Sequence, residues 1–176
     1  MNLFFTSGTD VYLKKLVEDY PNEVLLFMQN EGAFLLVHET EGNSFFKEPR
    51  KYEVIKSLGE FADVGFAVFN HIPVSDEGRP LFEYHFKNSI GEIENQAGFI
   101  AIRVLRPFTG DNYVVFTLWE NEWSFKNWKA SNSFEKVHSY IVEKEISKKQ
   151  KSKFFPRPSF VTKYFLVMED EKGNQD

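Results

Sequence analysis

The chain has 176 residues and no cysteine, and this absence removes several classes of site. Without a thiol there can be no disulfide, no thiolate-bound zinc and no cysteine nucleophile. The apolar runs are only a few residues long, whereas a membrane-spanning helix needs roughly 18 residues. The N-terminus also lacks the basic and apolar segments of a signal peptide. We therefore expect a soluble, cytoplasmic protein without a membrane span.

Several motifs of well-known chemistry are missing as well. The glycines at positions 59 and 78 have neither the spacing nor the following lysine of a phosphate-binding loop, and there is no HExxH or GxSxG motif. Acidic and basic residues are interspersed, with a net charge of −5, so no nucleic-acid partner is expected. One short basic cluster is either a solvated linker or a set of cations at a pocket mouth. It consists of Lys148, Lys149, Lys151 and Lys153.

Periodicity and turn residues predict a strand-rich first half with one helix. Its expected elements are strands at 3–5, 23–28, 33–39, 44–46 and 52–58, and a helix that follows the capping signal at 7–10 and stops at Pro21. The second half is predicted as a strand at 66–74, a helix that enters at 75–80 and stops near Gly98, strands at 99–106 and 113–119, a broken helix at 121–130 and 134–145, and a strand at 159–168.

The order βαββαβ in the second half is that of a ferredoxin-like unit. Such a unit leaves one face of its sheet uncovered, and the strand-rich first half can cover it. We therefore predict an α+β fold in which residues 1–62 complete a pseudo-dimeric β-barrel with a domain at 63–168, followed by a polar tail at 169–176. Because the pseudo-dimer lies within one chain, a monomer is expected.

Three residues are candidates for a binding site in an aromatic-rich interior, since 17% of the chain is aromatic. Asn70 is the only polar residue on a strand face that is otherwise apolar, and a buried amide needs a partner. His138 lies on the apolar stripe of a helix, where a neutral imidazole can ligate iron. Trp128 follows Phe125 by one turn on the preceding helix. Each residue taken alone also fits an ordinary core position.

The other histidines are weaker candidates. His38 and His71 lie on predicted strands beside residues that look ordinary, whereas His85 shares an apolar helix stripe with Phe82 and Phe86 and is kept as a reserve ligand.

The pattern resembles the antibiotic biosynthesis monooxygenase (ABM) superfamily, and within it the heme-degrading IsdG-type branch. That branch has an asparagine on the first strand and a tryptophan and histidine ten residues apart on the second helix, which correspond to Asn70, Trp128 and His138 here. The long first half is similar to that of HmoB-type members and of the staphylococcal target of RNAIII-activating protein. The resemblance rests on Gly98-Phe99, Leu105-Arg106-Pro107, the segment 113–120, Ser124-Phe125, Ser131 and Phe134, with 52–56, 59–61 and 157–161 outside the core motif.

The resemblance implies a heme-degrading monooxygenase, for which heme is both substrate and cofactor. His138 would be the axial ligand to the heme iron, Asn70 would orient the distal ligand and Trp128 would distort the porphyrin. O2 and an external electron donor, either a reductase or a small reductant, would be required. Arg103 and the basic cluster are guesses for the propionate contacts. Two alternatives remain: a non-catalytic heme-sensing or signalling protein, and a cofactor-free ABM oxygenase of an aromatic substrate.

Overall fold

The computed structural model describes residues 1–131 and 153–167, and its elements follow the predicted order closely. The strands are β1 (Asn2–Gly8), β2 (Val24–Asn30), β3 (Ala33–Thr40), β4 (Arg50–Leu58), β5 (Phe66–Pro73), β6 (Phe99–Pro107), β7 (Asn112–Trp119) and β8 (Phe160–Leu166). The helices are α1 (Asp10–Asp19), α2 (Arg79–Ser89) and α3 (Glu122–Lys129), with a 3₁₀ helix at Gly91–Asn95. The predicted helix at 134–145 lies outside the described residues.

The described strands form one closed barrel in the order β1-β3-β2-β8-β5-β7-β6-β4. This ring divides into two four-stranded units, β4-β1-β3-β2 and β8-β5-β7-β6. If the strands of each unit are numbered along the chain, both units have the same order, fourth-first-third-second. The units meet where β2 pairs with β8 and where β4 pairs with β6. The predicted pseudo-dimeric barrel within one α+β chain is therefore confirmed, while the boundary between residues 62 and 63 stays a prediction.

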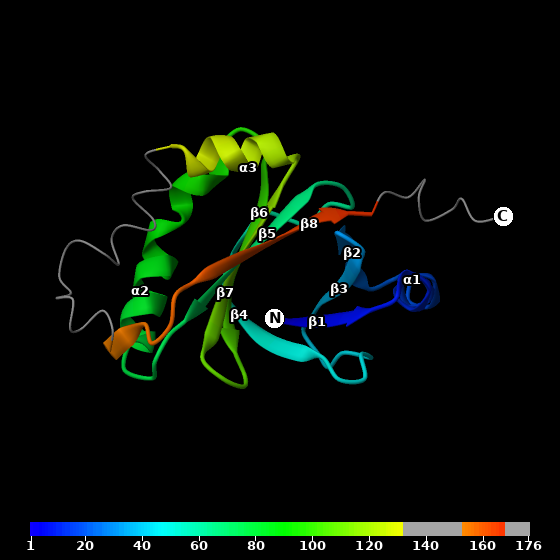
Figure 1. The fold of residues 1–176 in the computed structure, drawn as a ribbon, viewed down its shortest axis with the longest axis horizontal. Helices are drawn as coiled ribbons and strands as arrows, with labels where there is room; N and C mark the ends of the chain where they lie inside the picture. Colours follow the sequence, from blue (N-terminus) through cyan, green and yellow to red (C-terminus); the bar gives the residue numbers. More distant parts are fainter. Residues whose placement is uncertain (132–152, 168–176) are drawn as a thin grey trace.

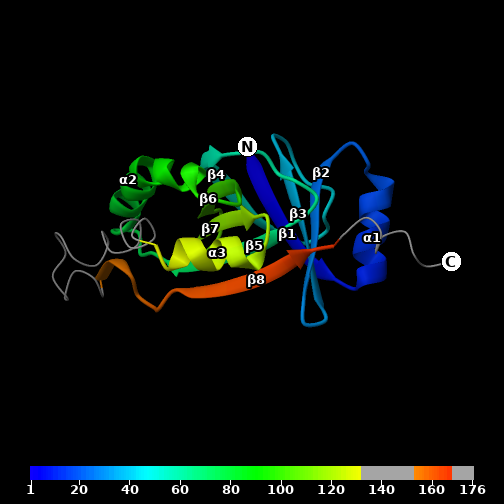
Figure 2. The ribbon, with the colours of Figure 1, turned by 90° about the horizontal axis from the view of Figure 1, so that it is seen from above.

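The barrel has apolar side chains on both sides of its wall because residues of a strand alternate between its two faces. The interior is filled by residues of both units, including Leu3, Met28, Phe69 and Phe116. A second core lies outside the wall, between β5–β7 and the helices α2 and α3, and a third lies under α1. Figures 1 and 2 show α1 at one end of the molecule and α2 at the opposite end, with the barrel between them.

Three local details differ from the predicted elements. The N-cap of α1 is Thr9, whose hydroxyl accepts a hydrogen bond from the Tyr12 amide. The predicted strand at 44–46 is a loop whose Phe46 packs into the core under α1. The helix α2 ends at Ser89 rather than near Gly98, because Gly91 favours leaving the helix. Ile93 nevertheless stays buried in the 3₁₀ turn, so the apolar spacing continues past the end of α2.

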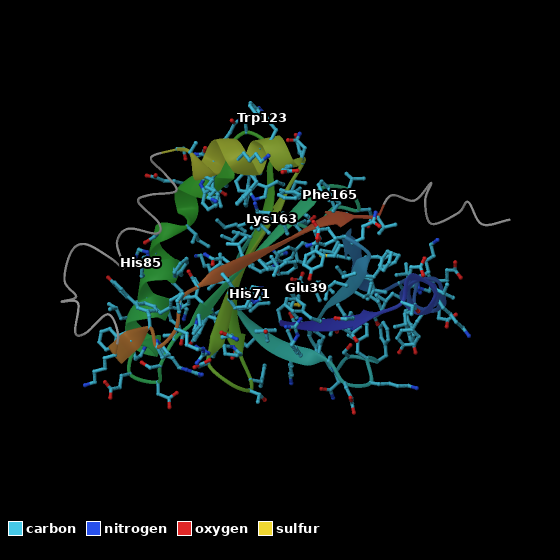
Figure 3. All side chains as sticks on the ribbon, in the orientation of Figure 1. Glu39, His71, His85, Trp123, Lys163 and Phe165 are labelled. Atoms are coloured by element: carbon cyan, nitrogen blue, oxygen red, sulfur yellow. The ribbon has the colours of Figure 1, made fainter. Side chains whose placement is uncertain are left out.

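A buried ion pair joins the two units. Arg103 on β6 donates to the Glu39 carboxylate of β3 at 2.8 Å and to the carbonyls of Leu58 and Gly59. Its guanidinium also lies over the Phe61 ring, 4.4 Å from the centroid. Because Arg103 is engaged in this way, the guess that it contacts heme propionates is not supported by its position. Glu39 of β3 is labelled in Figure 3.

Candidate functional site

Asn70 and Trp128 line the same pocket, on the outer side of the barrel wall. This outer pocket has a cavity volume of about 50 Å³. Its lining residues come from strands β5–β8, from α2 and α3 and from the 3₁₀ turn: Val68, Asn70, Phe86, Ile90, Ile93, Ile102, Val115, Thr117, Phe125, Trp128, Lys129 and Val161. Most of them are aliphatic or aromatic, so the pocket suits a ligand that is largely apolar and has few polar atoms.

Strand geometry places Asn70 at this pocket. Val68, Asn70 and Ile72 alternate onto the outer face of β5, whereas Phe69 points into the barrel. β5 is a central strand of the unit because it pairs with β7 on one side and β8 on the other, with Val115 and Val161 opposite Asn70. The predicted face is correct, and the amide stands among aliphatic neighbours from three adjacent strands.

Helix α3 positions Trp128. The helix begins at the N-cap Asn121, whose side chain accepts a hydrogen bond from the Ser124 amide at 2.9 Å. Gly98 allows α3 to lie close to the loop before β6, since a side chain at this position (φ +80°) would collide with Ser124. Trp128 is buried, and its ring packs against that of Trp119 with centroids 5.3 Å apart. The indole therefore has a rigid aromatic surface behind it.

The wall formed by α2 is held to the sheet by a polar cluster. Glu83 on α2 accepts hydrogen bonds from Arg106 and from the Tyr113 hydroxyl, the latter at 2.8 Å, and Arg106 also contacts Glu53 of β4. Burial raises the pKa of Tyr113 to about 12, and the bond to Glu83 acts in the same direction. Burial opposes ionisation of Glu83, yet the hydrogen bonds from Arg106 and Tyr113 hold its pKa below the usual value. The cluster anchors α2 and so fixes Phe86 and Ile90 at the pocket.

Two lining residues were not singled out in the sequence. Thr117 is buried, and its hydroxyl accepts a hydrogen bond from the Trp119 indole at 2.9 Å. Lys129 is an exposed cation beside Trp128 on α3. Strand alternation from Val115 could have indicated Thr117, whereas a lysine in the last turn of a helix is too common to indicate a site.

The histidines fall into different environments. His138, the predicted axial ligand, lies outside the described residues. His85 is buried with Nδ1 3.3 Å from the Ser89 hydroxyl, but it does not line the outer pocket. His38 lies 2.9 Å from both Glu23 and Ser44, and His71 faces the barrel interior. Within residues 1–131 and 153–167, no three His, Asp or Glu side chains are grouped as they would be around a metal ion.

The basic cluster is described only at its last member. Lys153 pairs with Glu77 at 3.0 Å on the surface, and the other three lysines lie outside the described residues. Among the helices that the structure describes, none has the length and apolar character needed to cross a membrane.

Comparison with known proteins shows what this chain is similar to. Residues 65–140 match the model of the family described as antibiotic biosynthesis monooxygenase. A heme-degrading monooxygenase of Listeria monocytogenes is 27% identical over 129 residues, which cover 73% of this chain and 77% of the relative. The signal transduction protein TRAP of Staphylococcus epidermidis is 26% identical over 174 residues, which cover 97% and 99%.

Solved structures share the whole barrel. The structure of a major regulator of staphylococcal pathogenesis has a TM-score of 0.80 and 25% identity, covering 94% of this chain and 98% of that one. The heme-degrading enzyme LmHde of Listeria monocytogenes has a TM-score of 0.73 and 21% identity, covering 94% and 99%. At that identity the likeness to LmHde concerns the fold alone. Residues 65–140, less than half of the chain, are thus similar to the antibiotic biosynthesis monooxygenase family.

Proposed function

We propose that this protein is a heme-degrading monooxygenase of the cytoplasm, which binds heme in the outer pocket and opens the porphyrin with O2 and electrons from an external reductant. The observation that carries the proposal is that Asn70 and Trp128, on separate elements, line one apolar pocket. The match of residues 65–140 to a monooxygenase family and the similarity to a heme-degrading monooxygenase at 27% identity support it further.

The residues of the outer pocket fit the chemistry of heme. A porphyrin is a broad apolar plate with two carboxylates at one edge, and the pocket combines aliphatic and aromatic walls with one cation, Lys129. Residues of the β5–β7 face and of α3 would hold the ring, and Lys129 would pair with a propionate.

Heme, when bound, would supply the iron centre at which O2 is activated, so that the ligand is also the substrate. The task of the protein is to position it. Trp128 would press against the plate because Trp119, 5.3 Å behind it, prevents the indole from moving away. The Asn70 amide would offer a hydrogen-bonding group beside the aliphatic residues Val115 and Val161. His138 is the residue that would ligate the heme iron, on the strength of the family resemblance.

Optical titration with hemin tests the proposal. Hemin is added to the purified apoprotein, and ascorbate then starts turnover in air with catalase present to remove free peroxide. We expect a saturable Soret band, followed by bleaching and release of iron. His138→Ala should abolish the band, and Asn70→Ala and Trp128→Ala should slow the bleaching. His85→Ala and Trp123→Ala are the matched controls, since neither residue lines the pocket, and Trp123 is 70% exposed on α3 (Figure 3).

A second candidate function is heme sensing or signalling without turnover. It is favoured by the similarity to the signal transduction protein TRAP of Staphylococcus epidermidis over 97% of this chain. The same titration separates the two functions, because a Soret band that persists in ascorbate and air would contradict the enzyme and support the sensor. Without any saturable band, both would be excluded in favour of an oxygenase that acts without a cofactor on an aromatic substrate.

A further inference from the structure

A second pocket lies inside the barrel, at the end where β4, β7 and β8 begin and β5 ends. It has a cavity volume of about 170 Å³. This mouth pocket is lined by residues of both four-stranded units: Phe5, Leu35, Arg50, Tyr52, Phe69, His71, Asn112, Phe160, Thr162 and Tyr164. Its location is separate from the outer pocket because Phe69 and His71 alternate with Val68 and Asn70 along β5. Figure 3 labels His71 in the interior between the two units.

The walls of the mouth pocket are aromatic and hold one another in place. Phe5 packs edge-on against Phe69 with centroids 5.4 Å apart, and Phe69 packs edge-on against Tyr164 at 5.6 Å. The His71 imidazole stacks on the Phe160 ring at 4.5 Å, with only 8° between the planes. Rings arranged in this way present faces and edges to a flat ligand of similar size.

Charge in the mouth pocket is positive. Arg50 is its only charged lining residue, and no carboxylate lies within 4 Å of its guanidinium among the residues that the structure describes. Burial, with a smaller contribution from Arg50, lowers the pKa of His71 to about 4, so the imidazole is neutral at pH 7. Burial also raises the pKa of Tyr52, which keeps the phenol protonated. The lining therefore offers one cation and no anion to a ligand.

Hydrogen-bonding groups complete the site. His71 Nε2 lies 2.9 Å from the Thr162 hydroxyl, so these two groups satisfy each other. The Oδ1 atom of Asn112 is buried and has no hydrogen-bond partner in the described part of the chain. Since a buried acceptor without a donor is costly, this amide favours a ligand that carries a hydroxyl or amine.

We propose that the mouth pocket binds a small hydroxylated aromatic carboxylate, with its ring among Phe5, Phe69 and Phe160. The Arg50 guanidinium receives the carboxylate, because a planar fork of N–H donors matches a carboxylate in shape and charge. The ring hydroxyl donates to Asn112 Oδ1. The site is independent of the heme proposed for the outer pocket, since it uses the opposite face of β5.

Calorimetric titration of the full-length apoprotein with 4-hydroxybenzoate at pH 7 tests this site. Saturable binding is expected, weakened at least tenfold by Arg50→Gln. Lys51→Gln is the matched control, because Lys51 is the neighbouring cation on β4 but lies over the rings of Phe4 and Phe108 rather than in the pocket. Arg50 is exposed, so its replacement should not prevent folding.

Ligand analogues assign the two polar contacts. Benzoate lacks the hydroxyl, and Asn112→Ala should weaken 4-hydroxybenzoate binding severalfold while leaving benzoate binding unchanged. Cyclohexanecarboxylate lacks the flat ring, and 4-hydroxybenzyl alcohol lacks the charge. Each should bind at least tenfold more weakly than 4-hydroxybenzoate. Loading the outer pocket with hemin should not displace the ligand.

Three outcomes would overturn the proposal. They are the absence of saturable binding of 4-hydroxybenzoate to the wild-type protein, binding that Arg50→Gln leaves unchanged, and binding that hemin displaces competitively. The first would mean that the mouth pocket does not bind this ligand, and the last would mean that the ligand and hemin share one pocket. None of these outcomes tests the turnover of heme, which the Soret titration follows separately.

Discussion

The two faces of strand β5 lead to two pockets of opposite character. On the outer face, Val68 and Asn70 line a pocket in which aliphatic and aromatic side chains predominate. On the inner face, Phe69 and His71 line a pocket that also contains an arginine, two tyrosines and an asparagine. β8 divides in the same way, with Val161 on the outside and Thr162 on the inside.

This difference follows from how each pocket is built. The outer pocket belongs to one four-stranded unit and its two helices, so its walls are a sheet face and two amphipathic helices. The mouth pocket needs strands of both units, and polar side chains gather where the ends of these strands approach solvent. One barrel wall can therefore support an apolar and a polar site, and the period of two in the strand keeps them apart.

The largest effect on stability is expected for the Arg103–Glu39 ion pair, which joins the two four-stranded units. Only the mouth pocket depends on this joint, because its lining residues come from both units. Replacing Arg103 by Met should lower the free energy of unfolding by about 3–5 kcal/mol, because the Glu39 carboxylate would remain buried without its partner. Urea denaturation measures this. Arg157→Met is the control: it breaks an exposed pair with Asp111, so its loss of stability should be much smaller. Equal losses in the two variants would mean that Arg103 does not join the units.

Substitutions on opposite faces of β5 should affect the functions of the two pockets separately. Asn70→Ala should slow heme degradation by about 100-fold, the size expected when a positioned hydrogen-bonding group is lost from a reacting site. His71→Ala, one residue away on the inner face, should leave the rate within about twofold, since a group that contacts no reacting atom contributes little to the barrier. Ascorbate-driven bleaching of the Soret band gives both rates. A slow His71 variant would contradict the independence of the two faces.

The loss of stability in mild acid should depend on the inner face of β5, where His71 lies. The pKa of His71 is about 4 in the folded chain, below its ordinary value near 6.5. The unfolded chain therefore binds more protons between these two values, so stability is complete above pH 6.5 and falls as the pH drops towards 4. The titration of His71 should therefore lower the free energy of unfolding by about 2 kcal/mol between pH 7 and pH 5.

Urea unfolding of the wild-type protein and of His71→Gln at the two pH values measures the loss. The variant should lose less stability on acidification. Glu83 and Asp111 have pKa values lowered from the ordinary range, so their contribution falls mainly below this window. An equal loss in both proteins would mean that His71 accepts a proton as readily in the folded chain as in the unfolded one.

The smallest effect is expected at the rim of the outer pocket. Lys129→Gln should weaken hemin binding by about three- to fivefold, because an exposed ion pair with a propionate is worth at most about 1 kcal/mol. Lys126→Gln is the control on the same helix, since Lys126 pairs with Glu122 and does not line the pocket. If the two variants bind hemin equally well, Lys129 makes no contact with it.

Local sequence patterns were sufficient to predict most of the barrel and the pocket positions of two of the three proposed site residues, while His138 lies outside the described residues. Alternation over 66–74 predicted the face of Asn70 correctly, and helical spacing placed Trp128 on the buried side of α3. The same alternation left His71 among ordinary interior residues. Whether an inward residue lines a pocket depends on side chains far away in the sequence, here Arg50 and Tyr52 of the other unit.

The central claim, that the outer face of β5 is the heme site, is tested most directly by locating the porphyrin. Gallium protoporphyrin, which is diamagnetic, can be titrated into protein with labelled isoleucine and leucine methyl groups. Ring-current shifts are expected for Ile90 and Ile102, which line the outer pocket, while Leu35 in the mouth pocket keeps its position. Shifts at Leu35 with Ile90 and Ile102 unmoved would contradict the account.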